Sequence, residues 1–159
     1  MFEKYFEEYK LGDTWRSRGR TITESDLVMF SAFSGDWFPL HSDAEYAKQT
    51  QYNERIAHGM LILSVTTGLL QFEPNIVVAF YGMDKVRFTS PTFIGDTIHL
   101  YGNVIDLKSK ITNQGVVTVL QEVRKQTNET VAVFEMKILV NKNNRMYEGP
   151  QEDKNGGIV

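Results

Sequence analysis

The most constraining feature of the sequence is a densely apolar segment in its middle, residues 58–70. If this region is helical, apolar side chains surround the helix almost completely: Met60, Leu61, Ile62, Leu63, Val65, Leu69 and Leu70. A membrane-spanning helix needs about 20 apolar residues, so the segment is too short to cross a bilayer. We therefore expect a buried helix, for which a wrapping sheet is the natural partner.

The second half of the chain has the pattern of β-strands. Apolar and β-branched residues alternate or cluster in residues 76–80, 85–88, 97–108, 115–124 and 130–140. The stretches between them, such as residues 81–84 and 127–129, contain turn residues and are too short for helical crossovers. The sequence therefore predicts an α+β fold in which a long, largely antiparallel sheet is wrapped around one buried helix.

Two short helices are predicted before the apolar segment. Thr23 and Asp26 have the spacing of a capping box, and Gly35 would end the helix that starts there. One face of this helix is expected to carry Leu27, Phe30 and Phe33. Residues 42–45 form a second capping box, which predicts another helix running to about Thr50.

Composition excludes several functional classes. The formal charge is −3 and no long basic run occurs, so nucleic acid is not an expected partner. The chain has no cysteine, which excludes disulfides and thiolate nucleophiles. The acidic, amphipathic N-terminus lacks the features of a signal peptide, and a cytoplasmic protein without membrane association is expected. We expect one domain over residues 1–140 and a loose polar tail over residues 141–159.

Residues 35–41 form a bent, aromatic-rich loop, because Gly and Pro prevent a continuous helix there. Asp36 and His41 lie across this bend, so both side chains can point into one cleft and form an acid–base couple. However, Gly-Asp is also a common turn dipeptide, and a lone histidine usually packs or hydrogen bonds. Together with Asp43 and His58 the pair could surround a divalent metal, but no local spacing requires one, and a metal-free site is expected.

The start of the apolar helix offers a second candidate site. Free amides near Gly59 can stabilise an oxyanion, and the missing side chain would let a ligand approach the backbone. Alternatively, Gly59 relieves crowding where a strand crosses the helix, and His58 caps the preceding turn. A hydroxyl such as that of Thr67 usually bonds back to a carbonyl of its own helix.

Three further polar residues lie on predicted strands. Lys85 and Arg87 would share one strand face, where two cations can meet a phosphate or simply be solvated. His99 would face away from Ile98 and Leu100, which favours a structural position toward solvent.

Residues 34–43, Ser-Gly-Asp-Trp-Phe-Pro-Leu-His-Ser-Asp, resemble the signature Gly-Asp-x-Asn-Pro-Leu-His of the MaoC-like dehydratase, or (R)-specific enoyl-CoA hydratase, family. Residues 56–61 are similar to the segment that opens the central helix of that family, and residues 86–91 with 95–97 extend the match. The resemblance covers about residues 5–140. It implies a hotdog fold and at least a homodimer whose sheets join edge to edge.

The resemblance also implies roles for individual residues. Asp36 and His41 correspond to the catalytic pair, Gly59 to the backbone donor to the thioester oxygen, and Thr67 to a hydroxyl where relatives often have serine. Which member of the pair is the base is left open. Phe38 replaces the asparagine of the signature, and this departure bears on both substrate and hydratase activity.

The implied activity is that of a cofactor-free hydro-lyase that interconverts 2-enoyl-CoA and (R)-3-hydroxyacyl-CoA, with coenzyme A as part of the substrate. Lys85 and Arg87 are the candidates to contact its phosphates. Two alternatives remain: a hotdog acyl-CoA thioesterase, and a non-catalytic subunit that binds acyl-CoA.

Overall fold

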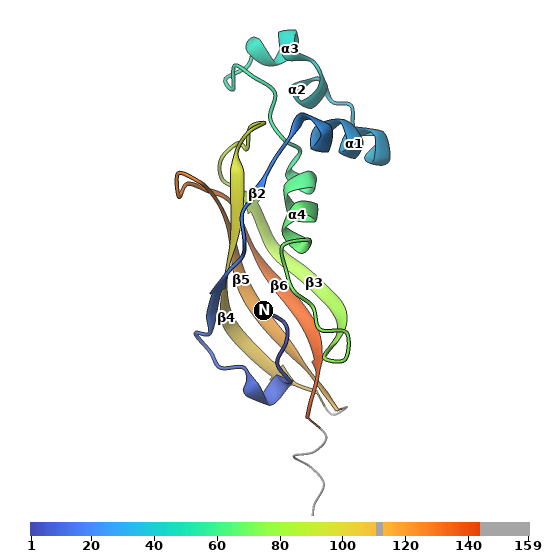
Figure 1. Ribbon diagram of the computed structural model, residues 1–159, viewed down its shortest axis with the longest axis vertical. Coiled ribbons are helices and arrows are strands. Elements are labelled where there is room, and N and C mark those ends of the chain that lie inside the picture. The colour runs from blue at the N-terminus through green and yellow to red at the C-terminus, as the bar shows by residue number, and fades with distance from the viewer. Residues whose placement is uncertain (111–112, 144–159) are drawn as a thin grey trace, which may run out of the picture.

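The computed structural model describes residues 1–110 and 113–143 (Figure 1). Its single antiparallel sheet has the strand order β1-β4-β5-β6-β3, with β2 also pairing with β4. The four long strands are β3 (Val77–Phe88), β4 (Thr97–Ser109), β5 (Gln114–Lys125) and β6 (Thr130–Asn141). Helix α4 (Gly59–Thr67) lies along one face of this curved sheet, while α1, α2 and α3 are grouped beyond one of its ends. The predicted α+β architecture is confirmed.

Three of the predicted strands, residues 97–108, 115–124 and 130–140, match β4, β5 and β6 closely. The turn predicted at residues 81–84 is wrong, because β3 is continuous there and pairs with β6 along its length. Register shifts at three places absorb the irregular residues, and Lys85 adopts a positive φ of 53° at one of them. A β-bulge accommodates an extra residue without ending the strand, so turn-type residues need not make a turn.

The two strands that sequence patterning missed are very short. β1 (Thr14–Arg16) and β2 (Arg20–Thr21) both pair with β4 at the sheet edge opposite β3. The indole of Trp15 lies over Gly102 on β4, where an added Cβ would lie 2.3 Å from the ring. The absence of a side chain at Gly102 therefore allows this close approach.

The core lies between α4 and the sheet. The buried residues of the helix are Leu61, Ile62, Leu63 and Thr66, and the leucines and isoleucine belong to the same apolar cluster as Ile98 and Leu100 of β4. Burying each such aliphatic side chain contributes about 1.5–3 kcal/mol. The helix is shorter than expected and is not enclosed on every side, since Met60 is 61% exposed in the single chain.

The predicted start and end of α1 (Glu24–Ser34) are confirmed: the Thr23 hydroxyl accepts the Asp26 N–H, and Gly35 follows with a φ of 78°. The predicted apolar face of α1 is wrong, because Leu27 is buried while Phe33 is 91% exposed. Residues six apart on a helix are separated by about 120° around its axis, so both cannot face the core.

The loop at residues 35–41 contains a short helix, α2 (Pro39–Ser42), with proline in its first turn. The aromatic residues of the loop are not buried, since Trp37 and Phe38 are 55% and 51% exposed in the single chain. The next helix, α3 (Ala44–Lys48), is capped by Asp43 and not by Ser42. The Ser42 hydroxyl is used elsewhere, donating to the Trp37 carbonyl at 2.9 Å.

The predicted start of the tail, residue 141, is one residue too early, because Asn141 still belongs to β6. Residues 144–159 lie outside the described residues, so the tail stays a prediction. Across the parts of the chain that the structure describes, no helix is long and apolar enough to span a membrane.

Candidate active site

The bend after α1 places Asp36 close to His41. Gly35 turns the chain in the left-handed conformation, and the Asp36 N–H then donates to the Ser34 hydroxyl at 3.2 Å. The Asp36 carboxylate in turn accepts the Phe38 N–H at 3.2 Å through Oδ1. Because α2 begins directly afterwards, His41 is held on its first turn, facing the carboxylate.

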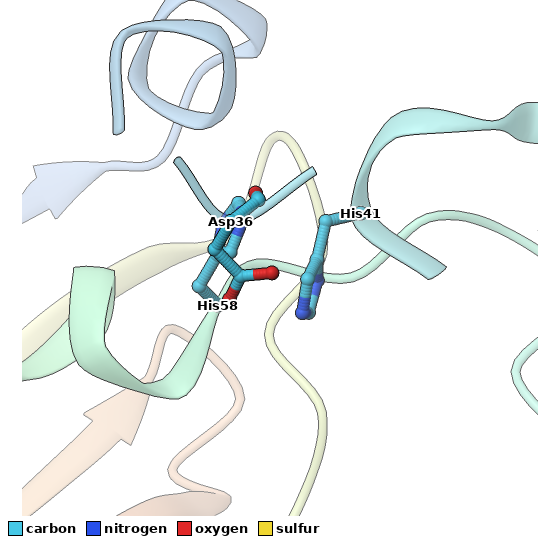
Figure 2. A group of neighbouring side chains, drawn as sticks. All are labelled: Asp36, His41 and His58. Atoms are coloured by element: carbon cyan, nitrogen blue, oxygen red, sulfur yellow. The ribbon is translucent and has the colours of Figure 1, made fainter. Parts of the chain in front are cut away.

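Three side chains meet at this point: Asp36, His41 and His58 (Figure 2). One carboxylate oxygen and one nitrogen from each ring all lie within 4.8 Å of one another. The structure thus brings together the two residues predicted as an acid–base pair and adds His58, for which capping of the preceding turn was one of the interpretations left open.

A backbone carbonyl determines which nitrogen of the neutral His41 ring carries the proton. Its Nδ1 lies 2.7 Å from the Ile56 carbonyl oxygen, which can only accept a hydrogen bond. In the neutral ring Nδ1 must therefore carry the proton, and Nε2 keeps a free lone pair. A neutral imidazole in this tautomer can take a proton at Nε2.

His58 is almost fully buried, at 2% exposure. Its Nε2 lies 3.0 Å from the Asp36 carbonyl oxygen and 3.2 Å from the Ser31 hydroxyl on α1. Burial lowers the pKa of His58, since desolvation disfavours the charged ring; the bond to the Asp36 backbone opposes this shift, and His41 adds to it. The ring is therefore neutral near pH 7.

Gly59 is the first residue of α4, where helical amides have no partner within the helix. An added Cβ there would lie 2.6–2.9 Å from the Phe88 ring of β3, so the strand crosses the helix start closely. The structure thus supports the crowding interpretation of Gly59 and is compatible with a backbone donor, since both require the absence of a side chain.

A cavity of about 730 Å³ opens at this place. Asp36, His41, His58 and Gly59 all line it. The rest of its wall comes mainly from the turn before α4 and from the segment after β3, and includes Tyr52, Ile56, Met60, Phe88 and Val131. A mixed wall of this kind can hold an apolar chain while polar groups act at one end.

By distance alone, Asp36, His41 and His58 could hold a metal ion. However, the two rings stack face to face, with centroids 3.9 Å apart and planes inclined by 30°. Imidazole lone pairs lie in the ring plane, so stacked rings do not direct them toward one ion. One nitrogen of each ring is also engaged with a backbone carbonyl. The arrangement fits acid–base chemistry better than metal ligation.

The other candidates lie apart from this cavity. The Thr67 hydroxyl donates to the Ser64 carbonyl at 2.7 Å, and Thr67 lies eight residues beyond Gly59, about 12 Å along α4. Lys85 pairs with Glu135 at 2.6 Å, and the bulge breaks the shared strand face expected with Arg87. The roles of all three stay predictions. His99 is half-buried beside Arg16 and faces away from its buried neighbours, as expected.

Comparison with known proteins gives a consistent result. A family model described as the MaoC like domain matches residues 8–127. The chain is 34% identical over 132 residues to an (R)-specific enoyl-CoA hydratase from Rhodospirillum rubrum, a match that covers 81% of this chain and 91% of that protein. It is 41% identical over 100 residues, 62% of this chain, to the protein MaoC of Klebsiella aerogenes, but this match spans only 30% of that protein.

Solved structures agree with the fold. A structure titled monoamine oxidase regulatory protein, from an Archaeoglobus species, is 37% identical with a TM-score of 0.83, covering 88% of this chain and 95% of that one. An R-hydratase from Pseudomonas aeruginosa is 31% identical with a TM-score of 0.69, covering 87% and 86%. A double-hotdog protein from Mycobacterium tuberculosis, 19% identical, has a TM-score of 0.77 over 88% of this chain and 44% of that one. The predicted hotdog fold is confirmed.

Proposed function

The chain belongs to the MaoC-like dehydratase family, and from this premise we propose that it is a hydro-lyase that adds water reversibly to 2-enoyl-CoA thioesters to give (R)-3-hydroxyacyl-CoA. The observation that supports this most is the convergence of Asp36 and His41 on a cavity whose wall includes the first residue of α4. The hydratases and dehydratases among the relatives favour the same reaction.

In this proposal His41 is the base. Its Nε2 takes one proton from a water molecule while the water oxygen bonds to the β-carbon of the enoyl group. Asp36 accepts a hydrogen bond from the same water through Oδ2, since Oδ1 is already bonded to the Phe38 amide. The carboxylate also stabilises the imidazolium that forms beside it.

The electrons of the double bond move to the thioester oxygen, and the Gly59 amide stabilises the resulting enolate. The imidazolium then returns its proton to the α-carbon, which restores the neutral ring. Because the proton and the water oxygen come from the same side, the addition is syn. Dehydration follows the same steps in reverse.

No cofactor is required in this scheme, and coenzyme A enters as part of the substrate. The apolar side chains Ile56, Ile62 and Val131 in the cavity wall suit an acyl chain. For Lys85 and Arg87, both exposed on β3, we propose contacts with the phosphates of coenzyme A, because their positive charges can pair with phosphate.

We also propose a homodimer through the edge of β3. This strand pairs only with β6 among the described strands, and Val78, Phe80 and Phe88 on it are 42–51% exposed in the single chain. An unpaired apolar edge favours pairing with a second copy. Light scattering of the purified protein should give twice the mass of the chain; a monomer would remove this part of the proposal.

The experiment is an assay with trans-2-enoyl-CoA thioesters of several lengths. Hydration removes the conjugated absorbance and releases no thiol, whereas a thioesterase releases free coenzyme A. We expect loss of conjugation without thiol and, on a chiral column, the (R)-hydroxyacyl product. Thiol release would favour the thioesterase alternative, and binding without turnover would favour a non-catalytic subunit.

A further inference from the structure

His58 contacts every part of the proposed catalytic arrangement, although it is not part of the acid–base pair. It is the residue before α4, and its ring bonds to Ser31 of α1 and to the backbone of Asp36. It also stacks on His41. We propose that His58, in one neutral tautomer, is a positioning residue that fixes the main chain of Asp36 and supports the ring of His41. This inference rests on the proposed function and deepens it.

The direction of the hydrogen bond follows from its partner. The Asp36 carbonyl oxygen can only accept, so the Nε2 atom of His58, at 3.0 Å, must be the donor. The Ser31 hydroxyl, 3.2 Å from the same nitrogen, accepts the other branch. This bond holds the residue that carries the proposed carboxylate against the start of α4.

The same tautomer leaves Nδ1 of His58 without a proton. This atom is buried and has no hydrogen-bond partner among the described residues. Buried polar atoms without a partner are unfavourable and uncommon, and where they persist they often mark functional sites. An ordinary packing role would be filled more easily by an apolar ring, so the donor at Nε2 is the feature that requires histidine.

The contact between His58 and His41 favours a neutral His58 ring. The ring of His58 contacts the rings of Phe30 and His41, with centroids 4.9 and 3.9 Å apart. The titratable groups facing it are Asp36 from the loop and His41 from α2, while α1 contributes only Ser31 and Phe30. During turnover His41 becomes an imidazolium, and a second cation stacked on it would oppose that step. Burial of His58 prevents this, so only one of the two rings gains charge.

Two substitutions separate the donor from the ring. His58→Phe keeps a flat ring between Phe30 and His41 but removes the donor, whereas His58→Gln keeps a donor near the Nε2 position and removes the ring. His99→Phe, on the outer face of β4, is the matched control. Loss of the donor should displace Asp36, and displacements of about 1 Å can lower turnover by about 100-fold.

We therefore expect His58→Phe to lower kcat by about 10- to 100-fold with KM within about threefold. His58→Gln should recover activity to within about tenfold of the parent, and His99→Phe should match the parent. Equal kcat values in His58→Phe and the parent would overturn the proposal.

Imidazole ¹H–¹⁵N spectra of the unmodified protein provide a readout that requires neither activity nor a variant that folds. The proposal predicts that His58 is in the neutral Nε2–H tautomer at pH 7 and remains so just below pH 6.5, the ordinary pKa of histidine. An Nδ1–H tautomer or a protonated ring would contradict it. A parent protein that hydrates no enoyl-CoA would instead contradict the proposed function, and the spectrum would still decide whether His58 donates to Asp36.

Discussion

Gly59→Ala tests the close crossing of β3 over the start of α4. The added methyl carbon would lie 2.6, 2.7 and 2.9 Å from three atoms of the Phe88 ring, whereas carbon atoms pack at about 3.5–4.0 Å. The ring must therefore move by roughly 1 Å. Phe88 is 51% exposed on an edge strand, so part of this displacement can be accommodated.

Overpacking of this kind costs about 1–3 kcal/mol, and replacing glycine in a helix returns up to about 1 kcal/mol. We expect a net loss of about 0.5–2 kcal/mol in the free energy of unfolding, measured by urea denaturation. In the double variant Gly59→Ala with Phe88→Ala the clash disappears, so the cycle should show a favourable coupling of about 1–2 kcal/mol.

Gly68→Ala at the other end of α4 is the control. Gly68 has right-handed helical dihedrals, and an added Cβ would meet only the Val65 carbonyl at 3.4 Å, an ordinary contact. This substitution should be neutral or stabilising by up to about 1 kcal/mol. If Gly59→Ala were as well tolerated as Gly68→Ala, or if removing the Phe88 ring gave no coupling, the crowding at the helix start would be refuted.

Three other predictions concern stability and the active loop. The pKa of His58 is lowered, so the unfolded chain binds more protons than the folded chain below the ordinary value of 6.5, and the free energy of unfolding should fall on acidification below about pH 6.5 by up to about 1.4 kcal/mol per pH unit. In His58→Gln this contribution to the slope should disappear, and an unchanged slope would contradict the assignment. Glu24→Gln breaks a two-bond pair with Arg55 at 2.5 and 2.9 Å, and because both groups are partly exposed the loss in thermal melts should be only about 0.5–1 kcal/mol. A loss above about 2 kcal/mol would show that the pair is more than a surface contact. Phe38→Asn removes an edge-to-face contact with His41, whose ring centroid lies 6.1 Å away. Such pairs contribute about 0.5–1.5 kcal/mol, so kcat/KM should change by less than about tenfold. A larger change would show that Phe38 takes part in the reaction itself.

The fold class was accessible from sequence because two patterns agree. Residues 58–70 required enclosure, and the alternating strands that follow supplied an antiparallel sheet. The ends of α1 were also accessible, since Thr23 and Gly35 act through local hydrogen bonding and local backbone conformation. These features depend on neighbours in sequence, which is why pattern analysis identifies them.

Features that depend on distant contacts were not accessible. Pairing with β6 keeps β3 extended through its bulges, although the sequence of residues 81–84 alone predicts a turn. The role of His58 arises from Ser31 and the Asp36 carbonyl, which lie 27 and 22 residues away. The one signal for this role in the sequence was a histidine at the start of a segment that must be buried, because a buried imidazole requires a hydrogen-bond partner.

The most direct test of the account is the rate of enoyl-CoA hydration by Asp36→Asn, His41→Gln and the double variant, beside the parent. If the two side chains act on one water molecule as a unit, each single substitution should lower kcat by about 10³-fold or more, and the double variant should be no slower than the worse single one. Losses that multiply in the double variant, or single variants with parental rates, would show that Asp36 and His41 do not work together.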